Sequence, residues 1–118
     1  YYFNFVQVDA LKAAESLKQE KGTETEVIDL RSLIPLDMDT VLQSVRKTGR
    51  CIVASQAINT GSFTAEVASR IMEQAFDYLD APILRVGAKD GIAPQSHVLE
   101  TVFLPRAQDI ADAAKKLL

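Results

Sequence analysis

Short apolar runs alternate along this chain with longer segments of helical periodicity, and this alternation restricts the possible folds more than any other feature. Runs rich in aromatic and β-branched residues favour four strands, over residues 1–6, 25–30, 51–54 and 83–86. Apolar residues three or four apart favour four helices, over residues 8–21, 38–48, 63–79 and 108–118. Short links between strands and helices are typical of parallel strands joined by crossovers. The sequence therefore predicts one α/β domain over residues 1–118, with three α/β/α layers.

Capping residues support the helix boundaries. Asp37 is a natural N-cap for the second helix, and Gly22 and Gly49 are placed to end the first and second helices. One face of each helix is apolar and is expected to face the core. These faces consist of Val8, Leu11, Ala14 (with Ala10 and Ala13 beside them) and Leu17; Met38, Val41, Leu42 and Val45; Val67, Ile71, Ala75 and Leu79; and Ile110, Ala114 (or Ala113) and Leu117.

Composition narrows the function classes without indicating any chemistry. The 118 residues include 13 basic and 16 acidic side chains, which give a net charge of −3 and make nucleic acid a poor partner. The single cysteine, Cys51, excludes an intrachain disulfide and suits a reducing cytoplasm. No apolar run approaches the ~20 residues of a membrane span. The chain opens without Met inside an apolar run, which suggests a domain cut from a longer chain.

The carboxyl ends of parallel strands usually carry the ligands of such a sheet, here near residues 31–36, 55–62 and 87–97. In the second of these loops, Gly61 and Ser62 lead into the longest helix, so free N–H groups could hold an anion. The alternative interpretation, which we favour, is that Gly61 makes a turn and that Ser62 or Thr60 caps the helix.

Other reactive side chains have weak support as a catalytic site. His97 is the only histidine, and a lone histidine in a loop more often faces solvent. Cys51 opens an apolar strand and is more readily explained as a small core residue than as a nucleophile. The spacing of Gly87 and Gly91 matches no nucleotide-binding motif. We therefore predict no catalytic, cofactor-binding or metal-binding residue in this chain.

The longest predicted helix carries charged residues at steps of three and four: Glu66, Arg70, Glu73, Asp77 and Asp80. Glu66 and Arg70 are placed to pair, whereas the acidic residues after them approach the helix C-terminus, where the dipole disfavours negative charge. Solvent screening could tolerate this conflict. The alternative is that Glu73, Asp77 and Asp80 form a docking stripe for a basic partner.

Several motifs in order resemble one known family. They are Glu26-Val27-Ile28-Asp29-Leu30-Arg31-Ser32-Leu33-Ile34-Pro35-Leu36-Asp37, Ser44 to Arg50, Thr60-Gly61-Ser62-Phe63-Thr64-Ala65-Glu66-Val67-Ala68, Leu79 to Val86, Leu99-Glu100 and Phe103-Leu104-Pro105. From about residue 8 to the end, the chain resembles the C-terminal domain of transketolase-like thiamine diphosphate enzymes. It is most similar to the beta part of 2-oxo acid dehydrogenases, the decarboxylating components that act on pyruvate or branched-chain substrates.

The resemblance implies a mostly parallel, five-stranded sheet and a parent enzyme that binds thiamine diphosphate and magnesium in other domains. The family's Gly-Asp-Gly cofactor motif is absent, and Lys89-Asp90-Gly91 does not replace it. The resemblance thus implies an oxidoreductase domain that is inactive alone. It would hold a dimer together and help to dock the small basic domain of the dihydrolipoyl acyltransferase.

Two alternatives to this function stay open. One is the C-terminal domain of another transketolase-like enzyme, such as transketolase or deoxyxylulose-phosphate synthase. The other is a free-standing module that binds an anion or a protein.

Overall fold

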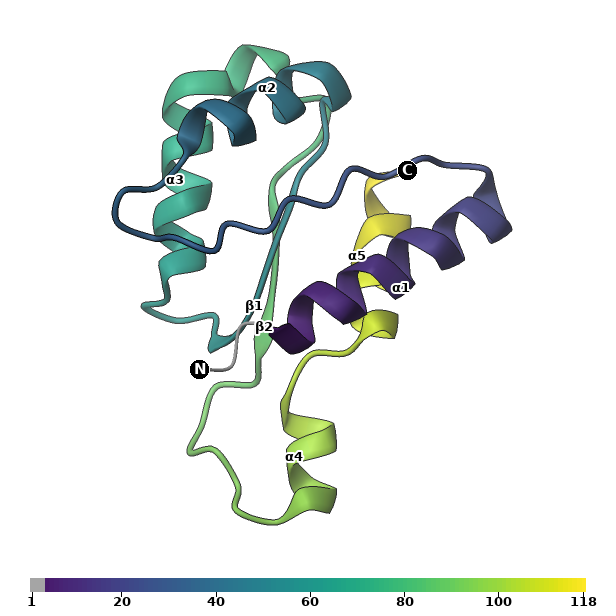
Figure 1. Cartoon of the computed structure of the whole chain (residues 1–118), viewed down its shortest axis with the longest axis vertical. Coiled ribbons are helices and arrows are strands. Elements are labelled where there is room, and N and C mark those ends of the chain that lie inside the picture. The colour runs from purple at the N-terminus through teal and green to yellow at the C-terminus, as the bar shows by residue number, and fades with distance from the viewer. Residues whose placement is uncertain (1–3) are drawn as a thin grey trace.

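The computed structural model describes residues 4–118 and forms three layers. Two parallel strands, β1 (Ile52–Ile58) and β2 (Leu84–Ala88), lie between two pairs of helices (Figure 1). On one side are α2 (Met38–Thr48) and α3 (Phe63–Ala75), and on the other are α1 (Asn4–Lys21) and α5 (Ala107–Leu117). The predicted α/β class and its three layers are confirmed.

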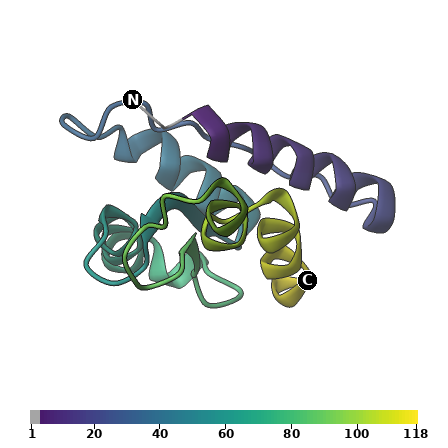
Figure 2. The same cartoon turned by 90° about the horizontal axis from the view of Figure 1, so that it is seen from below.

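Two shorter helices complete the described part of the chain. A single 3₁₀ turn, η1 (Phe76–Tyr78), follows α3 directly. The helix α4 (His97–Phe103) lies in a region for which the sequence showed no periodicity, and it buries none of its residues. It projects away from the layers at the bottom of Figure 1, the side from which Figure 2 is viewed. No helix in residues 4–118 is long and apolar enough to cross a membrane.

The sheet has fewer strands than expected. Residues 4–6 belong to α1, so the strand predicted over 1–6 is wrong there, and its first three residues lie outside the described part. The strand predicted over 25–30 is also wrong, because this segment pairs with no other strand. The described residues therefore hold two strands instead of five, with Ile52 opposite Leu84 and Ala54 opposite Val86.

The core is divided by the strands into two clusters. The first lies between β1 and the α2–α3 pair, and Ile71 of α3 is completely buried in it. The second lies between the strands and the α1–α5 pair, where Ala13 and Val86 are buried. β1 thus has an apolar layer on both faces, as is usual for parallel sheets, whereas β2 contributes Leu84 and Val86 only to the second cluster.

The capping signals near α2 work as predicted. The side chain of Asp37 accepts a hydrogen bond from the Thr40 N–H at 3.1 Å, and Gly49 ends the helix in the left-handed conformation. Gly22 ends α1 in the same way, its N–H donating to the Lys18 carbonyl at 3.0 Å. Backbone groups at helix ends need such partners, which explains why these boundaries were predictable.

The buried face of α1 agrees with the prediction only in part, at Leu17 and the adjacent Ala13, whereas the faces of α2 and α5 agree with it. Val8 and Leu11 are about half exposed, and the buried residues of α1 are Ala13 and Leu17. Small side chains such as Ala13 let α1 lie close to α5, because the distance between packed helices depends on the side chains at their contact. A side-chain bond joins the same two helices, from Lys115 Nζ to Glu20 at 2.7 Å.

Candidate functional site

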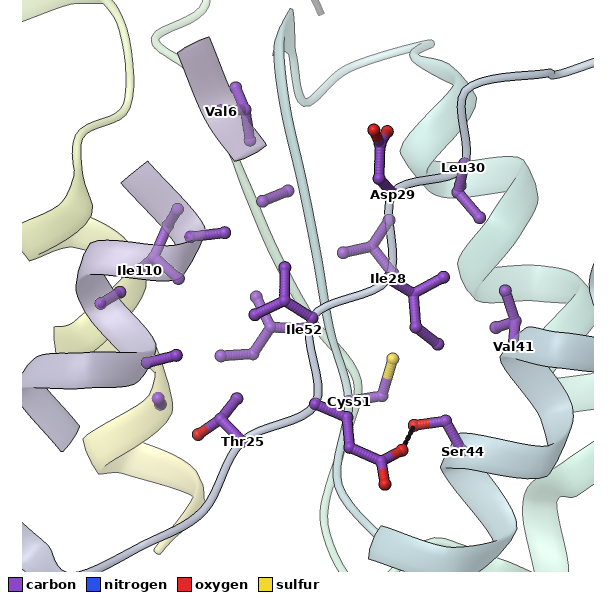
Figure 3. Close-up of a pocket in the computed structure, with 18 of the residues that line it drawn as sticks. Val6, Thr25, Ile28, Asp29, Leu30, Val41, Ser44, Cys51, Ile52 and Ile110 are labelled. Atoms are coloured by element: carbon purple, nitrogen blue, oxygen red, sulfur yellow. Dashed lines mark hydrogen bonds between the residues drawn. The ribbon is translucent and has the colours of Figure 1, made fainter. Parts of the chain in front are cut away.

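An apolar cavity of about 800 Å³ lies beside β1. One wall is β1 itself, and the facing wall is the extended segment 23–31, which crosses from α1 to α2 (Figures 1 and 3). Both core clusters contribute side chains, among them Ile71 and Ile110. No motif pointed to this cavity, because it exists where a predicted strand, 25–30, stays unpaired.

Polar groups are few around this cavity. Glu26 accepts a hydrogen bond from the Ser44 hydroxyl at 2.6 Å (Figure 3) and a second bond from Lys47. Both hydrogen bonds lower the pKa of Glu26, and the bond from Lys47 has the larger effect. The bonds from Ser44 and Lys47 to Glu26 hold segment 23–31 against α2.

Cys51 also lines the cavity, at the start of β1. Burial raises the pKa of its thiol to about 11, so it stays protonated near neutrality. A thiol attacks as the thiolate, so this environment favours a structural cysteine over a nucleophile.

The predicted anion loop lies at the carboxyl end of β1, where Gly61 and Ser62 precede α3. Gly61 has a φ of +68° with open space beside it, and Ser62 is the N-cap residue. The Ser62 hydroxyl makes no capping bond to the helix and instead shares a 2.5 Å hydrogen bond with Thr64. Anion binding here stays a prediction.

Contacts with β2 and with the loop after it hold the Gly61 loop in place. Thr60 donates to Asp90 at 2.9 Å, and Arg85 donates to the Asn59 carbonyl at 2.7 Å. A Cβ on Gly87 would lie 2.6 Å from the Ala57 carbonyl oxygen, so only glycine permits this approach. The nearby carboxylate of Asp90 would oppose an anion.

The acidic residues Glu73, Asp77 and Asp80 are all exposed, but they do not share one helical face. The helix predicted over 63–79 ends at Ala75, so Asp77 lies in η1 and Asp80 lies beyond it. The Asp80 N–H donates to the Gly49 carbonyl at 2.8 Å, which ties this residue to the end of α2. The spacing argument for a stripe is wrong beyond Ala75, whereas the docking role itself stays a prediction.

Exposed apolar side chains alternate with these acidic residues, which the sequence analysis did not recognise. Met72, Phe76 and Tyr78 are 42%, 63% and 52% exposed. We call these three, with Glu73 and Asp77, the α3-end patch. The guanidinium of Arg46 lies 5.5 Å from the centre of the Tyr78 ring, so one cation borders it. Phe76 falls outside the four-residue repeat of buried positions, which is the signal that could have revealed the patch.

His97 is the first residue of α4 and is exposed, as expected for a lone loop histidine. Its Nδ1 lies 3.7 Å from a carboxylate oxygen of Glu100. The structure brings neither Cys51 nor the Gly61 loop into contact with it among the described residues.

Comparison with known sequences places the chain in a family. The sequence profile described as "Transketolase, C-terminal domain" matches residues 6–110. The chain belongs to this family.

Named relatives of this transketolase C-terminal domain are subunits of larger enzymes. It is 44% identical to the pyruvate dehydrogenase E1 component subunit beta of Rhizobium meliloti (strain 1021), covering 90% of this chain and 23% of the relative. It is 43% identical to the same subunit of Bacillus subtilis (strain 168), covering 93% of this chain and 33% of the relative. It is 41% identical to the 2-oxoisovalerate dehydrogenase subunit beta of Pseudomonas aeruginosa (strain PAO1), covering 89% of this chain and 29% of the relative. The domain thus spans a third or less of these relatives' length.

A solved structure has the same fold. The protein described as "Split gene transketolase, inactive beta4 tetramer" superposes with a TM-score of 0.80 at 29% identity, covering 95% of this chain and 36% of that one. The agreement supports the three-layer arrangement.

The sequence analysis places the family's cofactor in other domains. Within residues 4–118 no three His, Cys, Asp or Glu side chains gather as metal ligands, and the Gly-Asp-Gly motif is missing from the sequence. That other domains bind thiamine diphosphate and magnesium stays a prediction.

Proposed function

We propose that this chain is the non-catalytic C-terminal domain of the beta subunit of a 2-oxo acid dehydrogenase. The parent would catalyse the oxidative decarboxylation of pyruvate or a branched-chain 2-oxo acid, with thiamine diphosphate and magnesium bound by other domains. Support comes from the relatives, which are named beta subunits of pyruvate and 2-oxoisovalerate dehydrogenases.

The role of the domain in this proposal is assembly. Subunit beta in the relatives' names implies partner subunits, and we propose a dimeric parent in which this domain also docks the dihydrolipoyl acyltransferase. The observation that carries the docking role is the α3-end patch, where Phe76 and Tyr78 are more than half exposed beside Glu73 and Asp77. Aromatic anchors bordered by charges are typical of protein interfaces, and acidic side chains suit a basic partner.

A charge reversal in the α3-end patch tests the docking role. We expect Asp77→Lys, in the polypeptide that carries this chain, to lower the affinity for the acyltransferase's basic binding domain. The salt dependence of this binding should also fall. Calorimetric titrations at two ionic strengths measure both effects. Glu15→Lys is the matched control, because Glu15 is also exposed but lies on α1, across the strands from α3. Equal affinities for Asp77→Lys and Glu15→Lys would exclude the patch.

A transketolase is the second candidate for the parent, because the split-gene transketolase superposes over 95% of this chain. The two candidates differ in substrate. The polypeptide that carries this chain, assembled with its partner subunits, should release carbon dioxide from pyruvate or 3-methyl-2-oxobutanoate under the first proposal. Transfer of a two-carbon unit between sugar phosphates, without decarboxylation, would support the second.

A further inference from the structure

The loop after β2 contains the one place in the chain where an aspartate is followed by glycine. Asp90 and Gly91 form this pair, and each of the other glycines follows a residue that is neither Asp nor Asn. A side-chain carboxyl group can close a five-membered ring with the backbone nitrogen of the next residue. Glycine shields that nitrogen least, because it has no Cβ. The pair is therefore reactive by its chemistry, and the fold decides whether the ring can close.

The structure leaves this pair accessible. Asp90 and Gly91 are both exposed, in a stretch between β2 and α4 that belongs to no helix or strand. Among the described residues, a Cβ on Gly91 would come within 4 Å only of the Phe103 ring, at 3.9 Å. Within residues 4–118 the Gly91 N–H makes no backbone hydrogen bond. The nitrogen is thus open to the side chain that precedes it.

The backbone on either side of the pair also leaves it room to move. The Lys89 N–H donates to the Phe103 carbonyl at 3.2 Å, which fixes the chain one residue before Asp90. The next regular element is α4, which begins at His97. Gly91 itself has a φ of +151°, a conformation that residues with a side chain rarely adopt. Ring closure therefore needs no helix or strand to open.

One contact opposes ring closure. The Thr60 hydroxyl, in the loop after β1, donates to Oδ2 of Asp90 at 2.9 Å. A carboxyl group held by a hydrogen bond samples fewer side-chain rotamers, and leaving that orientation costs the bond. The contact thus restricts the rotation that brings the carboxyl carbon to the Gly91 nitrogen.

We propose that Asp90–Gly91 is a site of spontaneous isoaspartate formation, and that Thr60 is the residue that restrains it. The Gly91 nitrogen attacks Cγ of Asp90 and forms a C–N bond, while the carboxyl OH group leaves with the amide proton as water. One water molecule then adds to the ring and breaks one of its two C–N bonds. Breaking the new bond restores aspartate, whereas breaking the original peptide bond leaves isoaspartate of the same mass.

Isomerisation at this position changes how the Gly61 loop is held. Isoaspartate adds a methylene group to the main chain and moves the free carboxylate, so the bond from Thr60 is lost. The other side-chain bond between the two regions, from Arg85 to the Asn59 carbonyl at 2.7 Å, does not involve Asp90. We expect faster hydrogen exchange at residues 59–62 in the isomerised protein. Unchanged exchange there would overturn this consequence.

Proteolysis after ageing tests the modification itself. Endoproteinase Asp-N cuts before aspartate but not before isoaspartate, so the polypeptide that carries this chain is aged at neutral pH, unfolded and digested. We expect progressive loss of cleavage before Asp90 at constant mass. Cleavage before Asp80 should be retained, because Asp80 is also exposed but is followed by alanine. Full cleavage at both sites after ageing would overturn the proposal.

A threonine substitution tests the restraint. Thr60→Val keeps the shape of the side chain and removes its hydrogen-bond donor, so we expect isoaspartate to form roughly fivefold faster, the effect of one ordinary hydrogen bond. Thr101→Val is the matched control, because Thr101 is an exposed threonine whose hydroxyl donates to the Val98 carbonyl instead. It should leave the rate unchanged. Equal rates in the two variants would exclude a role for Thr60.

Ageing in urea separates the folded contact from an effect of the sequence. The bond between Thr60 and Asp90 joins residues thirty positions apart, so it is lost when the chain unfolds. We therefore expect Thr60→Val and the unaltered chain to isomerise at the same rate in urea. A difference that persists in urea would overturn the restraining role of Thr60.

Discussion

Residues 37–88 and residues 4–36 were equally well supported by sequence patterns, yet they fold to different degrees. The first region has capped helices, paired strands and the fully buried Ile71. In the second, α1 is packed and capped, but segment 23–31 has no backbone partner in a sheet. Local patterns alone therefore did not determine which segments became strands.

The difference has a physical cause. A helix satisfies its backbone groups within its own segment, so the local signals at Asp37 and Gly49 were sufficient. A strand needs an adjacent edge from elsewhere in the chain. β1 and β2 pair with each other, whereas segment 25–30 lines the cavity and pairs with no strand edge.

The largest effect that separates the two regions should come from a buried isoleucine. Ile71→Ala is expected to destabilise the fold by roughly 2–5 kcal/mol, because Ile71 is completely enclosed and truncation leaves a void. Ile28→Ala should cost much less, because Ile28 is 37% exposed and already borders the cavity. Urea unfolding of both variants measures this contrast. Similar losses would mean that segment 23–31 is packed as tightly as α3.

The same contrast explains which parts of the fold could be predicted. The apolar faces of α2 and α5 were identified correctly because the buried positions repeat with the helical period, as at Val41 and Val45. The end of α3 was misjudged, because Leu79 continues the four-residue repeat although the helix stops at Ala75. Periodicity describes which face would be buried, but it does not say where the chain turns.

Two glycines that cap helices should differ next most strongly. Gly49 and Gly22 both have φ near +68°, so an alanine at either position pays about 1–2 kcal/mol for left-handed backbone. A Cβ at Gly49 would also lie 2.4 Å from a carboxylate oxygen of Asp80, whereas a Cβ at Gly22 meets open space. Gly49→Ala should therefore lower the thermal midpoint further than Gly22→Ala. Equal midpoints would show that Asp80 moves aside freely.

The candidate sites were predictable only in part. Sequence spacing correctly placed Gly61 and Ser62 before a helix, because a glycine turn is a local feature, although the Ser62 side chain makes no capping bond. It missed the exposure of Met72 and Phe76 and the cavity beside β1, because both depend on what the rest of the chain leaves uncovered. A local sequence pattern does not say which side chains the rest of the chain fails to cover.

The smallest effect should appear as a pH dependence confined to segment 23–31. Hydrogen bonds from Lys47 and Ser44 lower the pKa of Glu26 below its ordinary value of 4.5. The ionised carboxylate is thus favoured when the segment is attached, and its stabilisation is complete above pH 4.5 and disappears as the pH falls through the lowered pKa. Limited proteolysis by an acid-stable protease should show faster cleavage of segment 23–31 as the pH falls from 4.5 through the lowered pKa of Glu26.

Glu26→Gln should remove this pH dependence and make the segment equally open to cleavage across the window, because a neutral amide cannot form the charged bond to Lys47. Glu24→Gln is the matched control in the same segment, since the salt bridge of Glu24 within residues 4–118 is to Lys18, at 3.4 Å on a highly exposed surface. It should keep the pH dependence of the unaltered chain. If both variants behave alike, the segment is held by its apolar contacts with the cavity, and the ion pair to α2 is incidental.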